Sequence, residues 1–270
     1  MSFASEVRKK VSPLSLIRMK QKGEKIVCLT AYDGLSAALY GDLVDVLLVG
    51  DSVGMVRHLA PHTNQVDMSM MMFHVQSVVR ACPSSLIVAD MPFGSLEISD
   101  EQAIENALSF IRAGADAVKI EGGQGRAHTI HKIVSAGIPV MGHVGMQPQQ
   151  TLMSKSFRSV GRTDEEIATF RGDLTAVREA GAFAIVVEAV TNQAMDGMSE
   201  RESCPLIGIG AGASCDGQIL VAEDMLGCHH KVPKFVRRYG NLRDMVRDAV
   251  TRYGEDVRSS NFPLDDESYS

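Results

Sequence analysis

The fold is decided by one segment, Val46-Leu47-Leu48-Val49-Gly50-Asp51-Ser52-Val53-Gly54-Met55. Its first half is a continuous apolar run of strand length, which is typical of a parallel strand covered on both faces. The run stops at Gly50, where the missing side chain lets backbone or ligand come close. We therefore predict a buried strand that presents Asp51 at its carboxyl end.

The same pattern recurs along the chain and predicts eight strands. They cover residues 26–32, 46–52, 86–93, 117–123, 138–145, 183–190, 205–212 and, with a weaker pattern, 217–223. Segments with helical periodicity lie between them, for example residues 100–113. Alternating strands and helices imply parallel strands with right-handed crossovers, and eight such units in about 250 residues make a (β/α)8 TIM barrel.

We expect one barrel domain over residues 1–270. Residues 1–22 are basic and amphipathic and predict an N-terminal capping helix. A helix over 242–257 is expected to dock on the barrel or on a neighbouring subunit, and residues 259–270 are expected to form a loose tail. Two long connections, 53–72 and 146–163, follow predicted strands, and such loops usually cover the active site of a barrel.

Composition limits the possible partners and location. The chain has 45% hydrophobic and 22% charged residues, as soluble enzymes do, and its net charge of -6 argues against a nucleic-acid-binding surface. The sequence shows neither a membrane-spanning run nor a secretory signal, so we expect a cytoplasmic protein without a membrane partner. The cysteines indicate neither a disulfide framework nor a zinc site, since they are scattered without a C-x-x-C pair: Cys28, Cys82, Cys204, Cys215 and Cys228.

Polar residues end five of the predicted strands and should all face one mouth of the barrel. They are Asp51, Ser52, Asp90, Lys119, Glu121, His143 and Glu188. One aspartate at a strand end is as often a helix N-cap as a functional group, but chance is a poor account of seven together. We interpret this set as the candidate active site.

Three carboxylates in this set, Asp51, Asp90 and Glu121, are hard oxygen ligands that suit Mg²⁺. Carboxylates so close together repel one another unless a cation lies among them. The alternative is that they pair only with Lys119 and Arg112. Because side chains alternate along a strand, Lys119 and Glu121 share one face, and a cationic group there can neutralise the charge of a developing enolate.

Glu188 follows the apolar run 185–187 and should be partly desolvated, as a general acid or base requires. The alternative is a structural glutamate held in a salt bridge. His143 lies between Gly142 and Gly145, a setting that favours ligand contact, although a strand-end histidine can equally be a structural hydrogen-bonding residue. The glycine-rich segment 208–212 indicates a tight turn or a close approach to a bound carboxylate.

Several motifs resemble one known family. They are Thr30-Ala31-Tyr32-Asp33, Val49-Gly50-Asp51-Ser52-Val53-Gly54-Met55, Ala89-Asp90-Met91-Pro92-Phe93-Gly94, Val118-Lys119-Ile120-Glu121-Gly122-Gly123, Pro139-Val140-Met141-Gly142-His143-Val144-Gly145, Val187-Glu188, Ile207-Gly208-Ile209-Gly210-Ala211-Gly212 and Cys215-Asp216-Gly217-Gln218. In this order they resemble the ketopantoate hydroxymethyltransferases (3-methyl-2-oxobutanoate hydroxymethyltransferases), which belong to the phosphoenolpyruvate and isocitrate-lyase-like barrels.

The resemblance implies a one-carbon transferase of pantothenate and coenzyme A biosynthesis. Its reaction moves a hydroxymethyl group from 5,10-methylenetetrahydrofolate, as co-substrate, to 3-methyl-2-oxobutanoate, and gives 2-dehydropantoate through a magnesium-stabilised enolate. It also implies a homo-oligomer, commonly a decamer.

The resemblance further implies a role for each site residue. Mg²⁺ would be ligated by Asp51 and Asp90, with Glu121 ligating it directly or through water. The catalytic residues would be Glu188, as general acid/base, and Lys119. The residues that bind the oxoacid would be Asp51, Ser52, Asp90, Lys119 and His143.

Two loops depart from the family pattern. The family usually has Thr-x-x-Val-Ser/Thr where this chain has Thr63-Asn64-Gln65-Val66-Asp67, so Asp67 replaces a hydroxyl. Val160 stands where the family often has Gln. Both loops are expected to border the folate side, so these altered loops, with Asn64, Gln65, Asp67 and Val160, bear on the one-carbon donor.

Two alternative functions stay open. Another Mg²⁺-dependent 2-oxoacid lyase or aldolase of the superfamily would use the same enolate without folate, but such relatives typically place a reactive cysteine in a lid loop, and neither long loop has one. A non-catalytic metabolite-binding barrel would be expected to have lost a site residue, and all seven are present.

Overall fold

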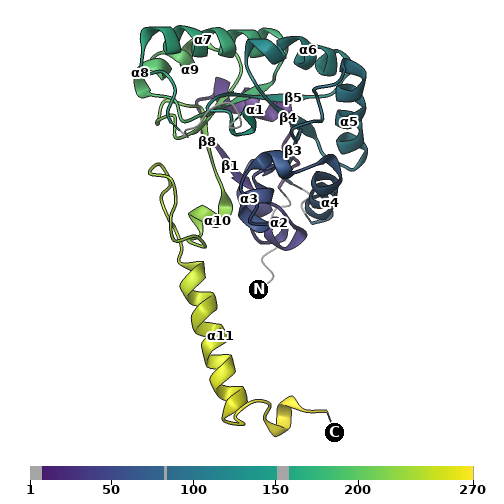
Figure 1. Cartoon of the computed structure of the whole chain (residues 1–270), viewed down its shortest axis with the longest axis vertical. Helices are drawn as coiled ribbons and strands as arrows, with labels where there is room; N and C mark the ends of the chain where they lie inside the picture. Colours follow the sequence, from purple (N-terminus) through teal and green to yellow (C-terminus); the bar gives the residue numbers. More distant parts are fainter. Residues whose placement is uncertain (1–7, 82–83, 151–157, 270) are drawn as a thin grey trace. The chain divides into compact units, whose positions relative to one another are not determined.

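The computed structural model describes residues 8–81, 84–150 and 158–269. Eight parallel strands form a closed barrel in the order β1 to β8 (Figure 1). They are β1 Ile26–Thr30, β2 Val46–Val49, β3 Leu86–Asp90, β4 Ala117–Glu121, β5 Val140–Gly145, β6 Ala184–Glu188, β7 Leu206–Ile209 and β8 Gly217–Leu220. The predicted (β/α)8 barrel is confirmed, with each strand shorter than the sequence pattern indicated.

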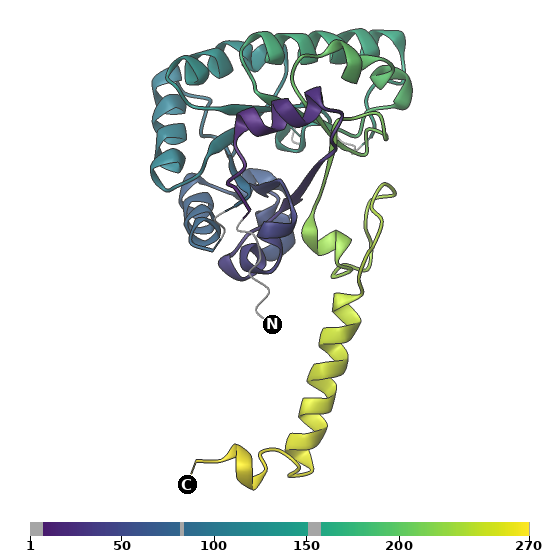
Figure 2. The ribbon, with the colours of Figure 1, turned by 180° about the vertical axis from the view of Figure 1, so that it is seen from behind.

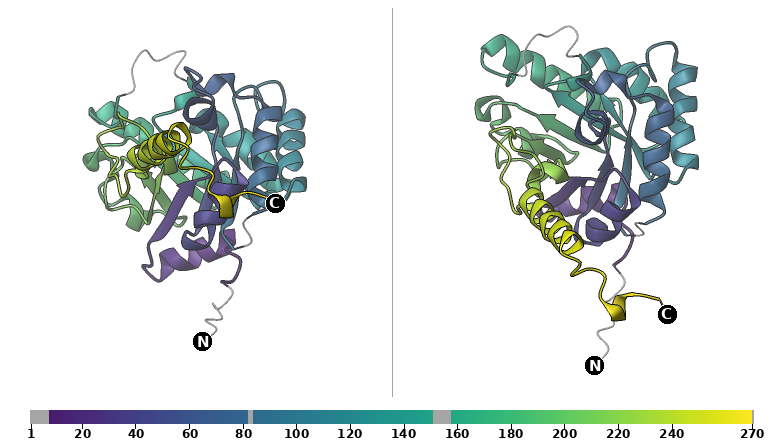
Figure 3. Two further views of the ribbon diagram at one scale, coloured as in Figure 1. Left: turned by 90° about the horizontal axis from the view of Figure 1, so that it is seen from below. Right: turned by 60° about the horizontal axis from the view of Figure 1, so that its bottom comes forward.

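Helices enclose the strands of this barrel (Figure 3). The α-helices of the barrel unit are α1 Pro13–Gln21, α2 Gly34–Tyr40, α3 Val53–Arg57, α4 Met68–Val79, α5 Asp100–Arg112, α6 Ala127–Ser135, α7 Asp164–Glu179, α8 Asn192–Met195 and α9 Met198–Arg201. The 3-10 turns are η1 Gly41–Leu43, η2 Thr63–Gln65, η3 Gln124–Arg126 and η4 Pro148–Gln150. The longer helices begin at side-chain caps, such as Ser99 before α5 and Thr163 before α7, which satisfy free N–H groups of the first turn.

Alternate residues of the strands fill the barrel interior with apolar side chains. Val88 of β3, Ala117 of β4 and Val186 of β6 belong to one buried cluster. Side chains two residues further along a strand point to the same side. The polar residues at the strand ends, such as Asp90 and Glu188, therefore form the last inward layer above this core.

The N-terminal segment closes the other end of the barrel. Leu16 of α1 is fully buried in the interior cluster, and Figure 2 shows α1, in purple, against the strands. Basic residues of this N-terminal segment form ion pairs with aspartates: Arg8 with Asp45, Lys10 with Asp116, and Lys20 with Asp216. Each of these aspartates also accepts a hydrogen bond from a backbone N–H group near the start of a strand. The predicted capping helix is confirmed from Pro13 to Gln21, whereas residues 1–7 lie outside the described part.

The connection after β2 is more ordered than a long loop. Where the sequence predicted an irregular segment over residues 53–72, the chain forms α3 and η2 and then enters α4. That expectation was wrong because five-residue and three-residue helices are too short to show a periodic pattern. Asp67 is the N-cap of α4 and accepts a hydrogen bond from Met70 N at 2.8 Å, a task that Ser or Thr performs equally well.

The chain divides into two compact units, residues 1–220 and 221–270. The second contains α10 Ala222–Met225, α11 Leu242–Arg258 and the 3-10 turn η5 Asp265–Glu267. The helix predicted over 242–257 is confirmed as α11, which has no buried residue. One domain over residues 1–270 and the loose tail stay predictions.

We predict that Lys20→Met lowers the free energy of unfolding by about 1.5–3 kcal/mol, because it removes a charged donor from the largely buried Asp216. Urea unfolding of the purified variant measures this change. The control is Lys22→Met, which removes an exposed pair with Glu24 at 3.8 Å and should shift the value by less than about 0.5 kcal/mol. Equal effects of the two substitutions would contradict the role given to α1.

Candidate active site

The strand register brings the predicted site residues together at the carboxyl end of the barrel. Asp90 pairs with Lys119 across β3 and β4, and Glu121 pairs with His143 across β4 and β5. Glu188 of β6 pairs with Gly145. The polar residues lie deep, with exposed fractions of 2% for Asp90 and 4% for Lys119.

An ion pair joins two of these strands. Lys119 Nζ lies 2.7 Å from Asp90 Oδ1, and both side chains are almost fully buried. The other carboxylate oxygen of Asp90 accepts a hydrogen bond from Asp51 N at 3.2 Å, so Asp90 also anchors the tip of β2. Ionic pairing of carboxylates with Lys119, which the sequence left open, is therefore part of this site.

His143 lies between two carboxylates. Its Nδ1 is 3.4 Å from Glu121 Oε2 and its Nε2 is 3.2 Å from Glu188 Oε2. Lys119 Nζ lies 3.3 Å from the same Nδ1. The imidazole therefore links the charged groups of β4 to Glu188 on β6, so the two sides of the site are electrostatically connected.

Burial and mutual repulsion change the acidity of the aspartates. Burial, with a contribution from Asp51, raises the pKa of Asp90 to about 7 against the opposing attraction of Lys119. Burial likewise raises the pKa of Asp51, with a contribution from Glu121. Burial opposes the charged form of Lys119, but Asp90, Asp51 and Glu121 outweigh it and raise the pKa of the ammonium group. Lys119 is therefore cationic at neutral pH.

Carboxylates also determine the charge of His143. Burial and the nearby Lys119 favour the neutral ring, yet hydrogen bonds to Glu121 and Glu188 raise its pKa to about 9. The ring is thus an imidazolium at neutral pH. Four carboxylates, two of them with raised pKa values, face two cationic side chains, which leaves up to two uncompensated negative charges in a buried site.

Ser52 has a partner that sequence reasoning missed. The hydroxyl of Tyr32, which follows β1 and is fully buried, lies 2.8 Å from Ser52 Oγ. Gly50 leaves room for this arrangement, because a Cβ built there would lie 2.8 Å from Ser52 Oγ. We predicted that Gly50 lets backbone or ligand come close, and the atom nearest to this position is the side-chain oxygen of Ser52. Tyr32 was part of a quoted motif, but no sequence pattern indicated its contact.

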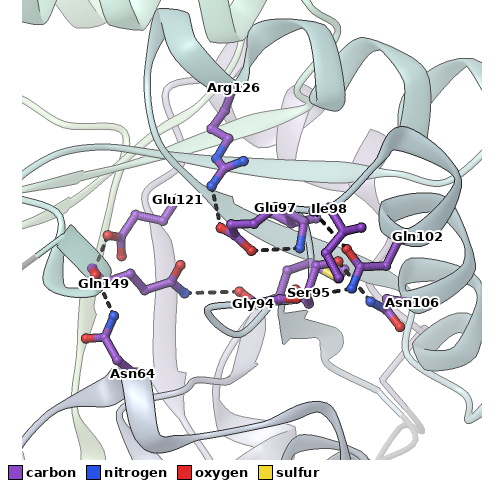
Figure 4. A network of polar contacts seen from close by, with 12 residues as sticks. Asn64, Gly94, Ser95, Glu97, Ile98, Gln102, Asn106, Glu121, Arg126 and Gln149 are labelled. Carbon is purple, nitrogen blue, oxygen red and sulfur yellow. Dashed lines mark hydrogen bonds and ion pairs between the residues drawn. The ribbon is translucent and has the colours of Figure 1, made fainter.

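Gln149 is the second residue that sequence reasoning missed. It lies in η4, is 7% exposed, and hydrogen-bonds to Asp51, Met91 and Glu121 at three strand ends. Figure 4 shows it between Glu121 and Asn64, which belongs to the segment after β2. Loop residues of this kind carry no periodic signal. Only its place soon after His143 in the long loop could have directed attention to it.

The negative charge of the site carboxylates suits a divalent cation, but their geometry limits how many of them can ligate one ion together. No three His, Cys, Asp or Glu side chains among the described residues converge closely enough to hold a metal ion together. Glu121 Oε1 accepts from Gln149 N at 2.9 Å, and its Oε2 faces His143. Asp51 and Asp90 are the neighbouring pair, and Mg²⁺ is commonly held by one or two carboxylates with waters and substrate oxygens.

A cavity of about 270 Å³ lies beside the carboxyl end of β5, between that strand and α7. Its lining includes Gly145, Val160, Phe170 and Asp173. Val160, which stands where the family often has Gln, forms an isolated β-bridge with Val190, next to the end of β6. Its position is therefore defined by backbone contacts. Residues 151–157 of the same loop lie outside the described part.

Other sequence expectations concern the surroundings of the site. The glycine-rich segment after β7 has positive φ at Gly210 (65°) and Gly212 (84°), which supports the tight-turn interpretation. Among residues 8–81, 84–150 and 158–269, no helix combines the length and hydrophobicity needed to cross a membrane.

The closed parallel barrel, with acidic and basic side chains at its strand ends, defines the chain as a TIM-barrel protein. Solved structures share this fold: a phosphonopyruvate hydrolase (TM-score 0.60, 15% identity, 96% of this chain and 92% of that chain) and a 2,3-dimethylmalate lyase (TM-score 0.60, 18% identity, with the same two coverages).

Sequence comparison defines the family. The family model described as ketopantoate hydroxymethyltransferase matches residues 10–265. A 3-methyl-2-oxobutanoate hydroxymethyltransferase of Pyrococcus abyssi is 45% identical over 94% of this chain and 90% of its own, and one of Caulobacter vibrioides is 47% identical over 94% and 92%. The chain belongs to the ketopantoate hydroxymethyltransferase family and is an enzyme of the transferase class.

We predict that His143 makes the protein less stable as the pH rises. Because its folded pKa of about 9 lies above the ordinary value of 6.5, its contribution is fully present below pH 6.5 and is lost as the pH rises through 9. The contribution of Asp90 to protein stability is also lost with rising pH, but in the lower window from pH 3.8 to about 7.

Thermal unfolding of the metal-free protein between pH 6.5 and 9.5 measures the effect. In His143→Gln the unfolding temperature should fall less steeply with rising pH. His131→Gln, at an exposed position on α6, should keep the wild-type pH dependence. An unchanged slope in His143→Gln would show that the ring is not the titrating group.

Proposed function

We propose that this enzyme transfers a one-carbon unit from 5,10-methylenetetrahydrofolate to 3-methyl-2-oxobutanoate and forms 2-dehydropantoate. A new C–C bond joins C3 of the oxoacid to the methylene carbon, C3 loses a proton, and water supplies the hydroxyl group as tetrahydrofolate leaves. The observation that carries the proposal is the buried cluster of Lys119 and His143 among four carboxylates, in a chain about 45% identical to enzymes of this name.

A metal ion completes the charge balance of this site. Asp51 and Asp90 would hold Mg²⁺, and the nearby Glu121 would ligate it directly or through water. When bound, Mg²⁺ chelated by a 2-oxoacid withdraws electrons from the carbonyl and makes the proton on C3 more acidic.

The protein's own groups then have distinct tasks. Lys119, cationic and buried, stabilises negative charge that develops on the substrate oxygen as the C3 proton leaves. Glu188 acts as the general acid/base, with His143 at 3.2 Å to orient its carboxylate. Ser52, positioned by Tyr32, and His143 line the space for the oxoacid.

The folate would enter from the side of β5. The cavity between β5 and α7 adjoins Gly145, whose strand partner is Glu188, so a donor bound there would lie near the proposed acid/base. The cavity offers about 270 Å³, roughly the lower limit of small-molecule sites, so it would accommodate part of the folate.

The deciding experiment supplies purified enzyme with 3-methyl-2-oxobutanoate, 5,10-methylenetetrahydrofolate and Mg²⁺, and follows 2-dehydropantoate by mass spectrometry. A parallel sample in D₂O without folate reports exchange at C3. Product and exchange together support the proposal. Exchange without product would indicate a different electrophile, as in an oxoacid lyase or aldolase, and neither would favour a non-catalytic barrel.

We predict that Glu188→Gln slows turnover about 10²- to 10⁴-fold, because the amide cannot transfer the proton. Metal affinity, measured by Mn²⁺ titration, should stay within about twofold of wild type. Glu179→Gln, on the exposed end of α7, is the control and should keep normal turnover. Normal turnover in Glu188→Gln would remove Glu188 from the mechanism.

We also propose that the enzyme is a homo-oligomer, and the family resemblance favours a decamer. The support is α11, which exposes a stripe of large apolar side chains: Leu242, Met245, Val246, Val250, Tyr253 and Val257. Light scattering should give a mass several times the 29.2 kDa of one chain. A monomeric mass at micromolar concentration would contradict this proposal.

A further inference from the structure

Gln149 uses both of its amide groups on the strand ends of the site. Its backbone N–H donates to Glu121 Oε1 at 2.9 Å. Its side-chain Nε2 donates to Asp51 Oδ2 at 2.8 Å and to the carbonyl oxygen of Met91 at 3.0 Å. One residue of η4 therefore connects the carboxyl ends of β2, β3 and β4.

We propose that Gln149 is the positioning residue that orients Asp51 for cation binding. The inference rests on the proposed metal site and adds a residue that would not contact the ion. A carboxylate on a short side chain can rotate, and a hydrogen bond to one oxygen fixes the direction in which the other oxygen faces. Partners of this kind behind a ligating carboxylate typically contribute 10- to 100-fold to metal affinity.

Burial makes this contact effective. Gln149 and Asp51 are 7% and 6% exposed, so water competes poorly for either partner. The Met91 carbonyl occupies the second proton of the amide group and fixes the amide plane. Gln149 is neutral, so it orients Asp51 without reducing the negative charge that attracts a cation.

The segment after β2 reaches the same residue. Asn64 Nδ2 donates to the carbonyl oxygen of Gln149 at 2.7 Å. Figure 4 shows Asn64, Gln149 and Glu121 joined in this order. Asn64 lies in the same loop as the departure at Asp67, and its contact connects η2 to the orientation of Asp51.

The test compares neighbouring glutamines of η4. Gln149→Met removes the side-chain donors but keeps the length of the side chain and the backbone N–H to Glu121. Gln150→Met is the matched control, because Gln150 is exposed. Mn²⁺ binding to each purified variant, followed by electron paramagnetic resonance, should show 10- to 100-fold weaker affinity for Gln149→Met and wild-type affinity for Gln150→Met.

A second measurement separates orientation from general damage. The Mg²⁺ concentration for half-maximal turnover should rise by the same factor in Gln149→Met, while kcat at saturating Mg²⁺ stays within about threefold of wild type. Asn64→Ala leaves the side chain of Gln149 in place and should weaken Mn²⁺ binding by a smaller factor. This variant keeps the test decisive if Gln149→Met does not fold.

The outcomes separate this inference from the proposed function. Wild-type Mn²⁺ affinity in Gln149→Met would overturn the positioning role and leave the metal site and the reaction intact. A folded Gln149→Met whose kcat cannot be restored by Mg²⁺ would also overturn it. If the wild-type protein bound no Mn²⁺, the metal assignment itself would fail, and this inference with it.

Discussion

The structure depends most on one buried ion pair, Lys119 with Asp90, at the end of the barrel. Removing two charges from water costs several kcal/mol for each ion unless other groups compensate it. The register of β3 and β4 places the two residues opposite each other, and further carboxylates surround the ammonium group. Because these attractions outweigh desolvation, a lysine can stay charged at a depth where few lysines are found. The apolar layers below, and α1 at the far end, supply the rigid frame that this arrangement needs.

The side chains that Tyr32 and Gln149 add to the site are neutral, and the charge count explains why. Four carboxylates face Lys119 and the imidazolium of His143, so the site keeps a negative excess that favours a divalent cation. Another lysine or arginine would cancel that excess. Tyr32 and Gln149 instead contribute hydrogen bonds: the Tyr32 hydroxyl shares one with Ser52, and the Gln149 side-chain amide donates one to Asp51. They restrict side-chain rotation and add no charge to the site, so orientation and charge are controlled by different residues.

Sequence reasoning predicted the strands and the residues at their ends because both follow from local patterns. An apolar run of strand length that ends in a polar residue identifies β2 and Asp51, and the same rule identifies Asp90, Glu121 and Glu188. It could not predict Gln149 or the partner of Ser52, since these contacts join segments distant in sequence. The short helices α3 and η2 were not predicted for a different reason: neither is long enough to show a repeating hydrophobic pattern. The ligation of a metal by Glu121, directly or through water, stays a prediction.

The departures from the family pattern act through contacts of different kinds. Asp67 caps α4 as a serine or threonine would, so this substitution changes no feature of the site. Val160 donates its N–H to Ala189 O at 2.8 Å, and a backbone contact of that type is open to any residue except proline. Asn64 differs from both, because its side chain holds the residue that holds Asp51. Of these three residues, only Asn64 is linked to a candidate site carboxylate, because Gln149 connects it to Asp51.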